Sequence, residues 1–188
     1  MKKLTVFNHI TLDGYFVGLN GDFSWARTGN DDPEYSAWVA GNASGDGQML
    51  FGRVTYDLMA GYWPTAMADQ HDPIVAKRMN SMQKVVFSRT MDKASWSNTR
   101  LVKGDLLSEI RKMKNEPGPD MVILGSGNII AQLAPENLID EYQMVVDPVV
   151  LGKGRTMFEG ISKMLSLKLT NTRTFNNGKI YLRFEPAT

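Results

Sequence analysis

Two short segments of the chain combine glycine with residues that suit a phosphate group. Val122-Ile-Leu-Gly-Ser-Gly-Asn-Ile-Ile130 and Leu50-Phe-Gly-Arg-Val-Thr-Tyr56 are each an apolar run that ends in glycine and passes into a helical pattern. Such a junction places backbone N–H groups and the positive end of a helix dipole at the edge of a sheet. Two of these junctions in one chain predict a dinucleotide with more than one phosphate group.

Each segment also has a simpler interpretation. Gly125-Ser-Gly127 does not complete the G-x-G-x-x-G pattern, because Ile130 stands where the third glycine would be, so it can be a tight turn without a ligand. Arg53 can be a solvated surface arginine. A cation is unfavourable in the first turn of a helix, however, unless an anion lies beside it. The planar fork of arginine matches phosphate oxygens, so the two segments together favour a phosphorylated cofactor.

Two further polar segments follow apolar runs, Ser88-Arg89-Thr90 and Gly152-Lys-Gly154-Arg155. The first offers hydroxyl groups and a guanidinium where open α/β sheets bind ligands, and it would suit the 2′-phosphate of NADP. The second is a glycine-rich basic turn that could close on a substrate phosphate. An ordinary polar loop and a simple β-turn explain these segments as well.

Asp13 and Trp25 are candidates for the substrate side of the site. Asp13, in Thr11-Leu-Asp-Gly14, could bind a substrate hydroxyl or amine or supply a proton, and the alternative is a turn aspartate that bonds to its own backbone. Trp25 could line an aromatic pocket, although core packing explains it equally well. The two histidines lack ligand spacing and the chain has no cysteine, so no metal site is predicted.

An alternation of strands and helices is expected to position these residues. Strands are predicted at residues 4–10, 48–51, 84–88, 99–102, 121–124 and 142–150, and alternating apolar and polar residues predict two more at 167–175 and 179–184. Helices are predicted at residues 33–44, 54–59, 74–82, 106–114 and 127–133, with residues 60–72 irregular. Pro148 predicts an edge or a bulge in its strand, and Asn177-Gly178 predicts a hairpin between the last two strands. The pattern indicates an α/β fold with a largely parallel sheet, helices on its faces and antiparallel C-terminal strands.

Length and composition fit a single globular domain over residues 1–188. The chain is 43% hydrophobic and carries 21 Lys and Arg against 20 Asp and Glu. Without a basic stripe, nucleic acid is not an expected partner. The chain has no apolar run of the roughly 20 residues that cross a bilayer, and its N-terminus reads as a strand rather than a signal peptide. A cytoplasmic protein that acts on a small molecule is expected.

Six motifs follow one another along nearly the whole chain. They are Leu12-Asp-Gly14, Gly52-Arg-Val-Thr-Tyr56, Val86-Phe-Ser88, Val122-Ile-Leu-Gly-Ser-Gly127, Asp140-Glu-Tyr142 and Pro148-Val-Val-Leu-Gly-Lys-Gly-Arg155. In this order they resemble the dihydrofolate-reductase-like superfamily, and more closely stand-alone relatives of the reductase domain of bacterial riboflavin-biosynthesis deaminase–reductase. The resemblance implies that superfamily's three-layer fold, NADPH as cofactor, and a homodimer that pairs through the C-terminal sheet region. The zinc signature of the deaminase domain is absent from the sequence.

The same resemblance implies roles for the candidate residues. Gly52, Arg53 and Thr55 would lie at the cofactor phosphates, Ser88 and Arg89 near the adenosine 2′-phosphate, and Gly125, Ser126, Gly127 and Asn128 at the pyrophosphate. Asp13 would face the substrate beside the nicotinamide and is the predicted proton donor, with Trp25 and Arg155 as further predicted substrate contacts.

The leading hypothesis is an NADPH-dependent reductase that acts on CH–OH or CH–NH groups. Its substrate would be a small heterocyclic or ribosylamino-pyrimidine-like compound, as for a 5-amino-6-(5-phosphoribosylamino)uracil reductase. The alternatives are a non-catalytic NADP(H)-binding module, a dihydrofolate or pterin reductase, and a structural dimer whose glycine turns bind nothing. The helix expected at residues 33–44 has Glu34 as its only acid, which disfavours folate.

Overall fold

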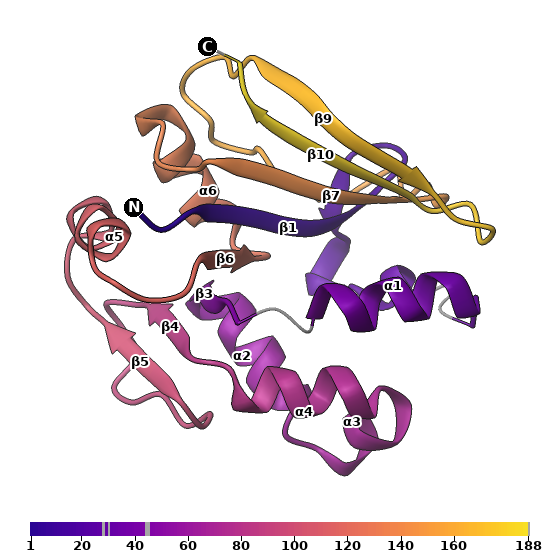
Figure 1. Ribbon diagram of the computed structural model, residues 1–188, viewed down its shortest axis with the longest axis horizontal. Coiled ribbons are helices and arrows are strands. Elements are labelled where there is room, and N and C mark those ends of the chain that lie inside the picture. The colour runs from indigo at the N-terminus through magenta and orange to yellow at the C-terminus, as the bar shows by residue number, and fades with distance from the viewer. Residues whose placement is uncertain (28, 30, 44–45, 188) are drawn as a thin grey trace.

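The computed structural model describes residues 1–27, 29, 31–43 and 46–187. An eight-stranded sheet has the strand order β5-β4-β3-β6-β1-β7-β10-β9, and β2 pairs with β8 in a small second sheet (Figure 1). The strands are β1 (Leu4–Thr11), β2 (Tyr15–Val17), β3 (Gln48–Gly52), β4 (Lys84–Phe87), β5 (Thr99–Val102), β6 (Met121–Leu124), β7 (Glu141–Asp147), β8 (Arg155–Thr156), β9 (Leu167–Thr174) and β10 (Ile180–Pro186). The helices are α1 (Pro33–Ala43), α2 (Arg53–Tyr62), α3 (Ala66–His71), α4 (Pro73–Ser81), α5 (Leu106–Asn115) and α6 (Gly127–Leu133), with short 3-10 turns η1 (Leu19–Gly21), η2 (Ser24–Arg27) and η3 (Ala134–Glu136).

Most of the large sheet is parallel. Parallel ladders join β5, β4, β3, β6, β1 and β7 in that order, whereas β10 runs antiparallel to both β7 and β9. Parallel neighbours require crossover connections, and here several of these connections are helices that cover the sheet. The predicted combination of a mostly parallel sheet with antiparallel C-terminal strands is therefore confirmed.

Helices pack on both faces of this sheet. Leu50 of β3 lies in a buried cluster with Ile110 of α5 and Ile130 of α6, whereas the next residue, Phe51, lies in a second cluster with Tyr56 of α2. Successive side chains of a strand point to opposite faces, so α5 and α6 cover one face and α2 covers the other. The three layers agree with the prediction.

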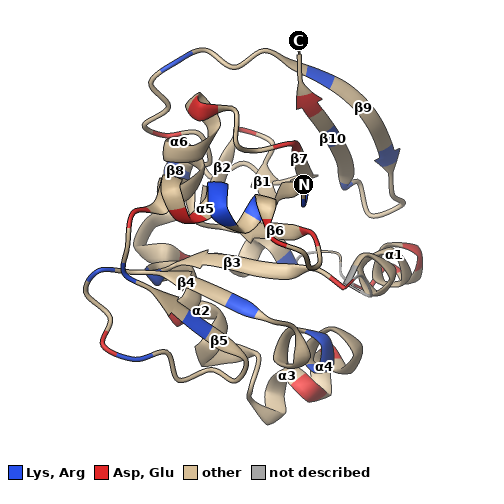
Figure 2. Cartoon of the chain, turned by 60° about the vertical axis from the view of Figure 1, so that its left-hand side comes forward, with Lys and Arg blue, Asp and Glu red and all other residues tan. Residues whose placement is uncertain are grey.

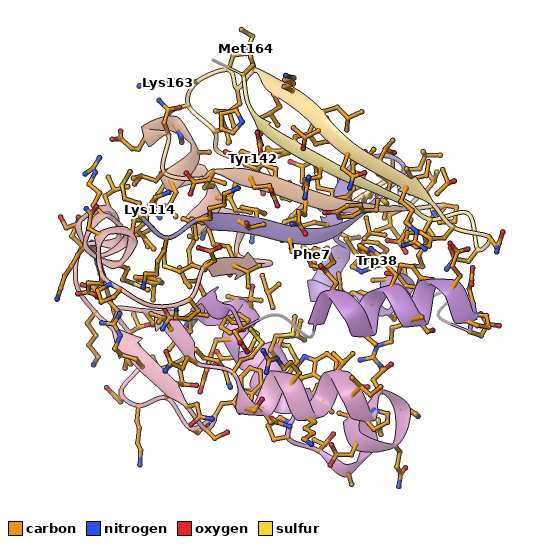
Figure 3. The ribbon with its side chains drawn as sticks, in the orientation of Figure 1. Phe7, Trp38, Lys114, Tyr142, Lys163 and Met164 are labelled. Carbon is orange, nitrogen blue, oxygen red and sulfur yellow. The ribbon has the colours of Figure 1, made fainter. Side chains whose placement is uncertain are left out.

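Helix α1 covers the part of the sheet formed by β1 and β7. Phe7 of β1 and Trp38 of α1 lie toward one another between the helix and the sheet, with ring centroids 6.4 Å apart (Figure 3). Tyr35 of α1 and Val145 of β7 belong to the same aromatic-rich cluster. Because Val6 belongs to the cluster under α5 and α6, Phe7 and α1 lie on the face shared with α2.

The predicted elements are largely present, with three differences. Residues 60–72 contain α3, so the prediction that this segment is irregular was wrong there. The helix is capped by Thr65, whose Oγ1 accepts a hydrogen bond from the Ala68 amide at 3.3 Å. The strand predicted over 142–150 ends as β7 at Asp147, before Pro148, and it lies between β1 and β10 rather than at an edge. The pairing of β2 with β8 was not predicted. Ser44, the expected last residue of the first helix, lies outside the described residues.

Charged residues of both signs are interspersed along the helices and strands in view in Figure 2. This agrees with the near-equal numbers of basic and acidic residues, 21 and 20. Within the described ranges, no helix is long and apolar enough to cross a bilayer.

Candidate functional site

Six parallel strands end at one edge of the large sheet. β1 ends at Thr11, β3 at Gly52, β4 at Phe87, β5 at Val102, β6 at Leu124 and β7 at Asp147. Open α/β sheets bind ligands in the crevice beyond such carboxyl ends. The fold therefore brings to one edge the segments that hold most of the predicted site residues.

The two glycine-containing turns are bonded directly to each other. The Gly52 amide donates a hydrogen bond to Ser126 Oγ at 2.8 Å, and the Ser126 amide donates to Thr55 Oγ1 at 3.1 Å. Ser126 Oγ in turn donates to the Leu124 carbonyl oxygen at 3.0 Å. We refer to residues 52–55 and 125–128 as the double glycine turn. The hydroxyl oxygens of Thr55 and Ser126 accept hydrogen bonds within the protein, so backbone amides and the Arg53 guanidinium are the groups that it offers to a ligand.

Packing explains why residue 125 is glycine. Gly125 and Ser126 both have a φ of 59°, and a Cβ atom on residue 125 would lie 2.7 Å from Thr55 Oγ1. Ser126 adopts the same left-handed conformation at a cost in free energy, and its hydrogen bonds offset this cost. The amides of Gly127 and Asn128 follow in the first turn of α6, where helix amides lack intrahelical acceptors.

Asn8, which is not among the predicted site residues, ties β1 to the double glycine turn. Its Oδ1 accepts a hydrogen bond from the Gly125 amide at 2.8 Å, and its Nδ2 donates to the Gly125 carbonyl oxygen at 3.3 Å. The parallel ladder between β1 and β6 ends at the pair Phe7 and Leu124. The side-chain amide therefore continues the pairing where the backbone ladder stops. A buried asparagine in phase with the apolar residues of its strand is the sequence signal for this role.

Arg53 is the first residue of α2 and lies at the double glycine turn. Its side chain is exposed, and it forms no ion pair within the described part of the chain. A cation at the start of a helix is opposed by the helix dipole. Arg53 is therefore the cation of this edge that most plainly lacks an anion.

Ser88 and Arg89 follow β4, next to the double glycine turn. Gly52 pairs with Phe87 as the last pair of the ladder between β3 and β4, so Ser88 and Arg53 each follow the end of neighbouring strands. Ser88 Oγ accepts hydrogen bonds from the amides of Thr90 and Met91 at 3.3 and 3.0 Å, which shapes the turn. Arg89 is exposed.

Asp13 is held by the loop that follows β7. Thr11 Oγ1 donates to Asp13 Oδ1 at 2.6 Å, and the Gly152 amide donates to Oδ2 at 2.7 Å. The hydrogen bond from the Thr11 hydroxyl holds the pKa of Asp13 below its ordinary value. Partial desolvation opposes this shift, and the amides of Gly152 and Leu151 add to it. A carboxylate with a low pKa is a poor proton donor near neutral pH. The bonds give Asp13 a structural role, and its catalytic role stays a prediction.

Trp25 and Arg155 differ in whether the described residues supply a partner for their polar side-chain atoms. Trp25 is buried, and its Nε1–H has no hydrogen-bond partner among the described residues. Arg155 is exposed on β8, and its Nε donates to Glu159 Oε2 at 3.0 Å. The indole N–H of Trp25 is therefore enclosed by the protein, whereas Arg155 is accessible and has an acidic neighbour.

Four side chains that were not predicted form a buried network where β1 and β7 end. Lys179 Nζ bonds to Asp147 Oδ1, and both side chains are fully buried. Asp147 Oδ2 lies 2.8 Å from His9 Nδ1, and the Tyr35 hydroxyl lies 3.2 Å from His9 Nε2. We call these four residues the His9 network. It joins β1, β7, α1 and the residue that precedes β10.

The protonation of Tyr35 sets the hydrogen-bond directions in the His9 network. Burial, and then the charge of Asp147, raise the pKa of Tyr35 well above its ordinary value, so the hydroxyl keeps its proton. In the neutral imidazole, Tyr35 then donates to Nε2, and Nδ1–H donates to the Asp147 carboxylate. Lys179 supplies the positive charge that compensates Asp147 in the interior.

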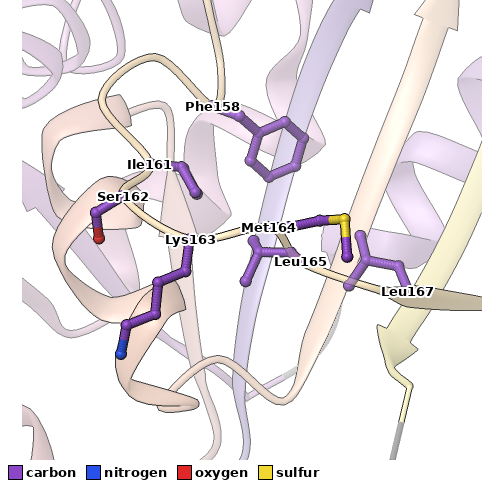
Figure 4. Close-up of a pocket in the computed structure, with 7 residues that line it drawn as sticks. All are labelled: Phe158, Ile161, Ser162, Lys163, Met164, Leu165 and Leu167. Atoms are coloured by element: carbon purple, nitrogen blue, oxygen red, sulfur yellow. The ribbon is translucent and has the colours of Figure 1, made fainter.

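Two surface pockets lie outside the double glycine turn. One, of about 390 Å³, adjoins the Asp13 loop and is lined by Gly18, Leu19, Asp22, Leu151, Gly152 and Lys153. The other, of about 420 Å³, is formed by the segment before β9 and is lined by Phe158, Ile161, Ser162, Lys163, Met164, Leu165 and Leu167 (Figure 4). The second pocket contains no predicted site residue, so we do not assign the cofactor to it.

Comparison with known sequences gives a family match over nearly the whole chain. Residues 2–181 match the family described as RibD C-terminal domain. The uncharacterized protein YyaP of Bacillus subtilis (strain 168) is 31% identical over 173 residues, which cover 92% of this chain and 89% of YyaP.

Two solved structures share the fold at low sequence identity. A dihydrofolate reductase from Enterococcus faecalis, complexed with NADP(H) and RAB-propyl, has a TM-score of 0.67 and 14% identity, with 99% of this chain and 97% of that chain covered. A diaminohydroxyphosphoribosylaminopyrimidine deaminase/5-amino-6-(5-phosphoribosylamino)uracil reductase from Thermotoga maritima has a TM-score of 0.66 and 13% identity, with 99% of this chain and 57% of that chain covered. These likenesses confirm the expected dihydrofolate-reductase-like fold.

Proposed function

The chain belongs to the RibD C-terminal domain family, and from this premise we propose that it is an NADPH-dependent oxidoreductase. Its substrate is a small heterocyclic compound of the ribosylamino-pyrimidine type, and hydride transfer to it forms a CH–OH or CH–NH group. The observation that carries the proposal is the double glycine turn with Arg53, which has no carboxylate partner among the described residues, at the carboxyl edge of the sheet. NADPH supplies the hydride when bound, and the protein supplies binding, orientation and a proton.

The residues of the double glycine turn fit the diphosphate of a dinucleotide. Gly127 and Asn128 offer amides without intrahelical acceptors, and Arg53 offers a guanidinium with no carboxylate partner in the described ranges. The hydrogen bonds among Gly52, Thr55 and Ser126 hold both turns in fixed positions. A phosphate here would relieve the unfavourable position of Arg53 at the start of α2.

The preference for NADPH over NADH rests on Ser88 and Arg89. Both residues follow β4, in register with the double glycine turn. Ser88 shapes the turn through the amides that it binds, and Arg89 is exposed there. We assign the adenosine 2′-phosphate to this turn, with Arg89 as its cation.

On the substrate side, we assign a contact with the heterocycle to Trp25, whose ring packs against Phe23 with centroids 5.4 Å apart. We assign a substrate phosphate to Arg155 and a substrate contact to Asp13. The Thermotoga maritima protein is named for a phosphoribosylamino-uracil substrate, which supports this class.

A second candidate is a non-catalytic NADP(H)-binding module, which the engagement of Asp13 by the loop after β7 favours. A dihydrofolate or pterin reductase is less well supported. Glu34, the acid of α1, bonds to Arg173 at 2.8 Å and to Asn176 at 3.2 Å on the β9–β10 hairpin. The homodimer and the cytoplasmic location stay predictions.

A thermal-shift titration with NADPH and with NADH tests the cofactor assignment. A ligand that binds only the folded state raises its stability with the logarithm of concentration, and NADPH should stabilise the wild type more than NADH. Arg53→Ala should lose about 1.5–3 kcal/mol of NADPH binding, the scale of a charge-assisted hydrogen bond. Arg111→Ala is the matched control, because Arg111 is an arginine of α5 paired with Glu136 on the opposite face.

The outcomes separate the candidate functions. An absence of NADPH stabilisation, or equal losses in Arg53→Ala and Arg111→Ala, would show that the cofactor assignment is wrong. Tight NADPH binding without oxidation in the presence of 5-amino-6-(5-phosphoribosylamino)uracil would favour the non-catalytic module.

A further inference from the structure

The chain contains two Asn-Gly pairs, Asn20-Gly21 and Asn177-Gly178. An asparagine that precedes glycine readily loses its side-chain amide, because glycine has no side chain to hinder attack by its backbone nitrogen on the asparagine. Both pairs share this intrinsic chemistry. The surroundings of each pair in the folded protein therefore decide which of them reacts.

Asn177 is held by hydrogen bonds on both sides of its side-chain amide. Its Nδ2 donates to the Gly29 carbonyl oxygen at 2.8 Å, and its Oδ1 accepts a hydrogen bond from the Lys179 amide at 3.1 Å. The backbone amide of Asn177 donates to Asp32 Oδ2 at 3.0 Å. Asn177 thus joins the turn of the β9–β10 hairpin to the segment that precedes α1.

Asn20 lies in the short turn η1 with a φ of 58°, and residues 19–22 are exposed. Its side chain forms no hydrogen bond within the described part of the chain. The turn around it is closed by two local hydrogen bonds. The Gly18 amide donates to the Asp22 carbonyl oxygen at 2.8 Å, and the Asp22 amide donates to the Leu19 carbonyl oxygen at 3.2 Å. The side-chain amide of Asn20 is therefore accessible and unrestrained by other elements.

We propose that Asn20 is a modification site, at which the folded protein converts asparagine to aspartate and isoaspartate. The backbone nitrogen of Gly21 attacks Cγ of Asn20, so that a new N–Cγ bond forms and the Cγ–Nδ2 bond breaks. Nδ2 leaves as ammonia with the proton that the Gly21 nitrogen gives up. Water then opens the five-membered imide ring: cleavage of the new bond yields aspartate, and cleavage of the original peptide bond yields isoaspartate. Water is the only co-reactant.

The two pairs differ in what ring closure must disrupt. The asparagine side chain and the next backbone nitrogen have to turn toward each other before the ring can close. At Asn20 this rotation disturbs the hydrogen bonds of one exposed turn. At Asn177 it breaks both side-chain hydrogen bonds and separates the hairpin from the segment before α1. Local openings that break few contacts cost the least free energy, so Asn20 reacts faster in the folded protein.

The modification changes the pocket beside the Asp13 loop. Residues that flank Asn20 line this pocket of about 390 Å³, together with Lys153. Isoaspartate carries the main chain through its Cβ atom, which lengthens the turn and disrupts the hydrogen bond from the Asp22 amide to the Leu19 carbonyl oxygen. Either product also adds a negative charge two residues from the Asp22 carboxylate. The shape and charge of this pocket therefore change as the protein ages.

Peptide mapping of aged wild-type protein tests the proposal without a variant. The full chain is incubated in oxygen-labelled water at mildly alkaline pH, and mass spectrometry quantifies the labelled acid at each Asn-Gly pair. Conversion at Asn20 should be about tenfold or more faster than at Asn177, because each hydrogen bond that holds Asn177 adds to the cost of its opening. In urea that unfolds the chain, the two rates should become similar. Equal rates in native buffer, or a tenfold difference that persists in urea, would overturn the proposal.

Two matched variants connect Asn20 to the charge of the aged protein. Ion-exchange chromatography separates the acidic product from the fresh protein. Asn177→Gln should acquire the acidic form as the wild type does, whereas Asn20→Gln should acquire it far more slowly, because glutamine closes the corresponding larger ring slowly. An acidic form that accumulates at the wild-type rate in Asn20→Gln contradicts the assignment, and peptide mapping decides the matter if that variant fails to fold.

Hydrogen exchange tests the change in the pocket. The Asp22 amide is bonded across the turn in the fresh protein, so it should exchange faster in the isolated isoaspartyl form. The Gly125 amide, bonded to Asn8 at the double glycine turn, is the internal control and should exchange at the same rate in both forms. Unchanged exchange at Asp22 would overturn the remodelling of the turn.

Discussion

Replacing Gly125 by alanine tests how the double glycine turn is built. Residue 125 has a φ of 59°, and an added Cβ would lie 2.7 Å from Thr55 Oγ1. The left-handed backbone costs an alanine about 1–2 kcal/mol. Displacing Thr55 would also break the 3.1 Å hydrogen bond that it accepts from the Ser126 amide, a net loss of about 0.5–1.5 kcal/mol. Gly125→Ala should therefore lower the free energy of unfolding by roughly 1.5–3.5 kcal/mol.

Two further variants separate the free-energy cost of the left-handed backbone from the cost of the clash with Thr55. Gly21 has a φ of 80°, and a Cβ there would have nothing within 4 Å, so Gly21→Ala should cost only the backbone term, about 1–2 kcal/mol. In a Thr55→Ala background, the two closest atoms to the added Cβ are gone. Gly125→Ala should then cost about as much as Gly21→Ala.

Urea denaturation followed by tryptophan fluorescence measures these changes, and an NADPH titration follows the same variants. The reasoning would be refuted if Gly125→Ala and Gly21→Ala cost the same, or if the double-mutant cycle with Thr55→Ala gave a coupling below about 0.5 kcal/mol. NADPH affinity should fall in Gly125→Ala and stay unchanged in Gly21→Ala, because only the first change distorts the proposed phosphate site.

Two other predictions concern Lys84 and Arg155. Burial lowers the pKa of Lys84 from 10.5 to about 8; the unfolded chain therefore binds more protons between these pH values, and stability should rise as the pH increases through this window. The urea midpoint of the wild type should be higher at pH 10.5 than at pH 8, the bounds of that window, and the midpoint of Lys84→Met should not rise. An equal rise in both proteins would contradict the role of Lys84. Arg155→Ala should raise KM for the 5′-phosphorylated ribosylamino-uracil about tenfold or more and leave KM for the unphosphorylated compound unchanged. An equal change for both compounds would exclude a phosphate contact.

Local signals account for the parts of the fold that were predictable. The short strands β5 and β6 have their predicted bounds because turn residues close each of them, although only β6 is an apolar run throughout. Asn177-Gly178 forms the turn between β9 and β10, as predicted, with Gly178 at a φ of 82°. The fold brings the predicted residues Gly52, Thr55 and Ser126 into direct contact, because their turns follow neighbouring strands of one sheet.

The His9 network was not predictable in this way, because none of its members belongs to a local sequence pattern that indicates a site. His9 is a polar residue in a strand, Asp147 precedes a proline, and Lys179 follows a hairpin turn. Only the register of β1 and β7, which pairs Thr11 with Asp147, brings the carboxylate to the imidazole. Contacts of this kind depend on tertiary pairing between distant segments, and no spacing in the sequence encodes them.

The central place of β1 in the sheet has a consequence for synthesis on the ribosome. β1 pairs only with β6 and β7, and Asn8 meets its partner Gly125 across a separation of 117 residues. At about 5–20 residues per second, the first strand is made roughly 6–25 s before the segment that completes its pairing. During that interval its apolar side chains have no neighbouring strand, and they are available to chaperones or to other nascent chains. Codon changes that slow translation before residue 125 should therefore lower the yield of folded protein more than equal delays after β7.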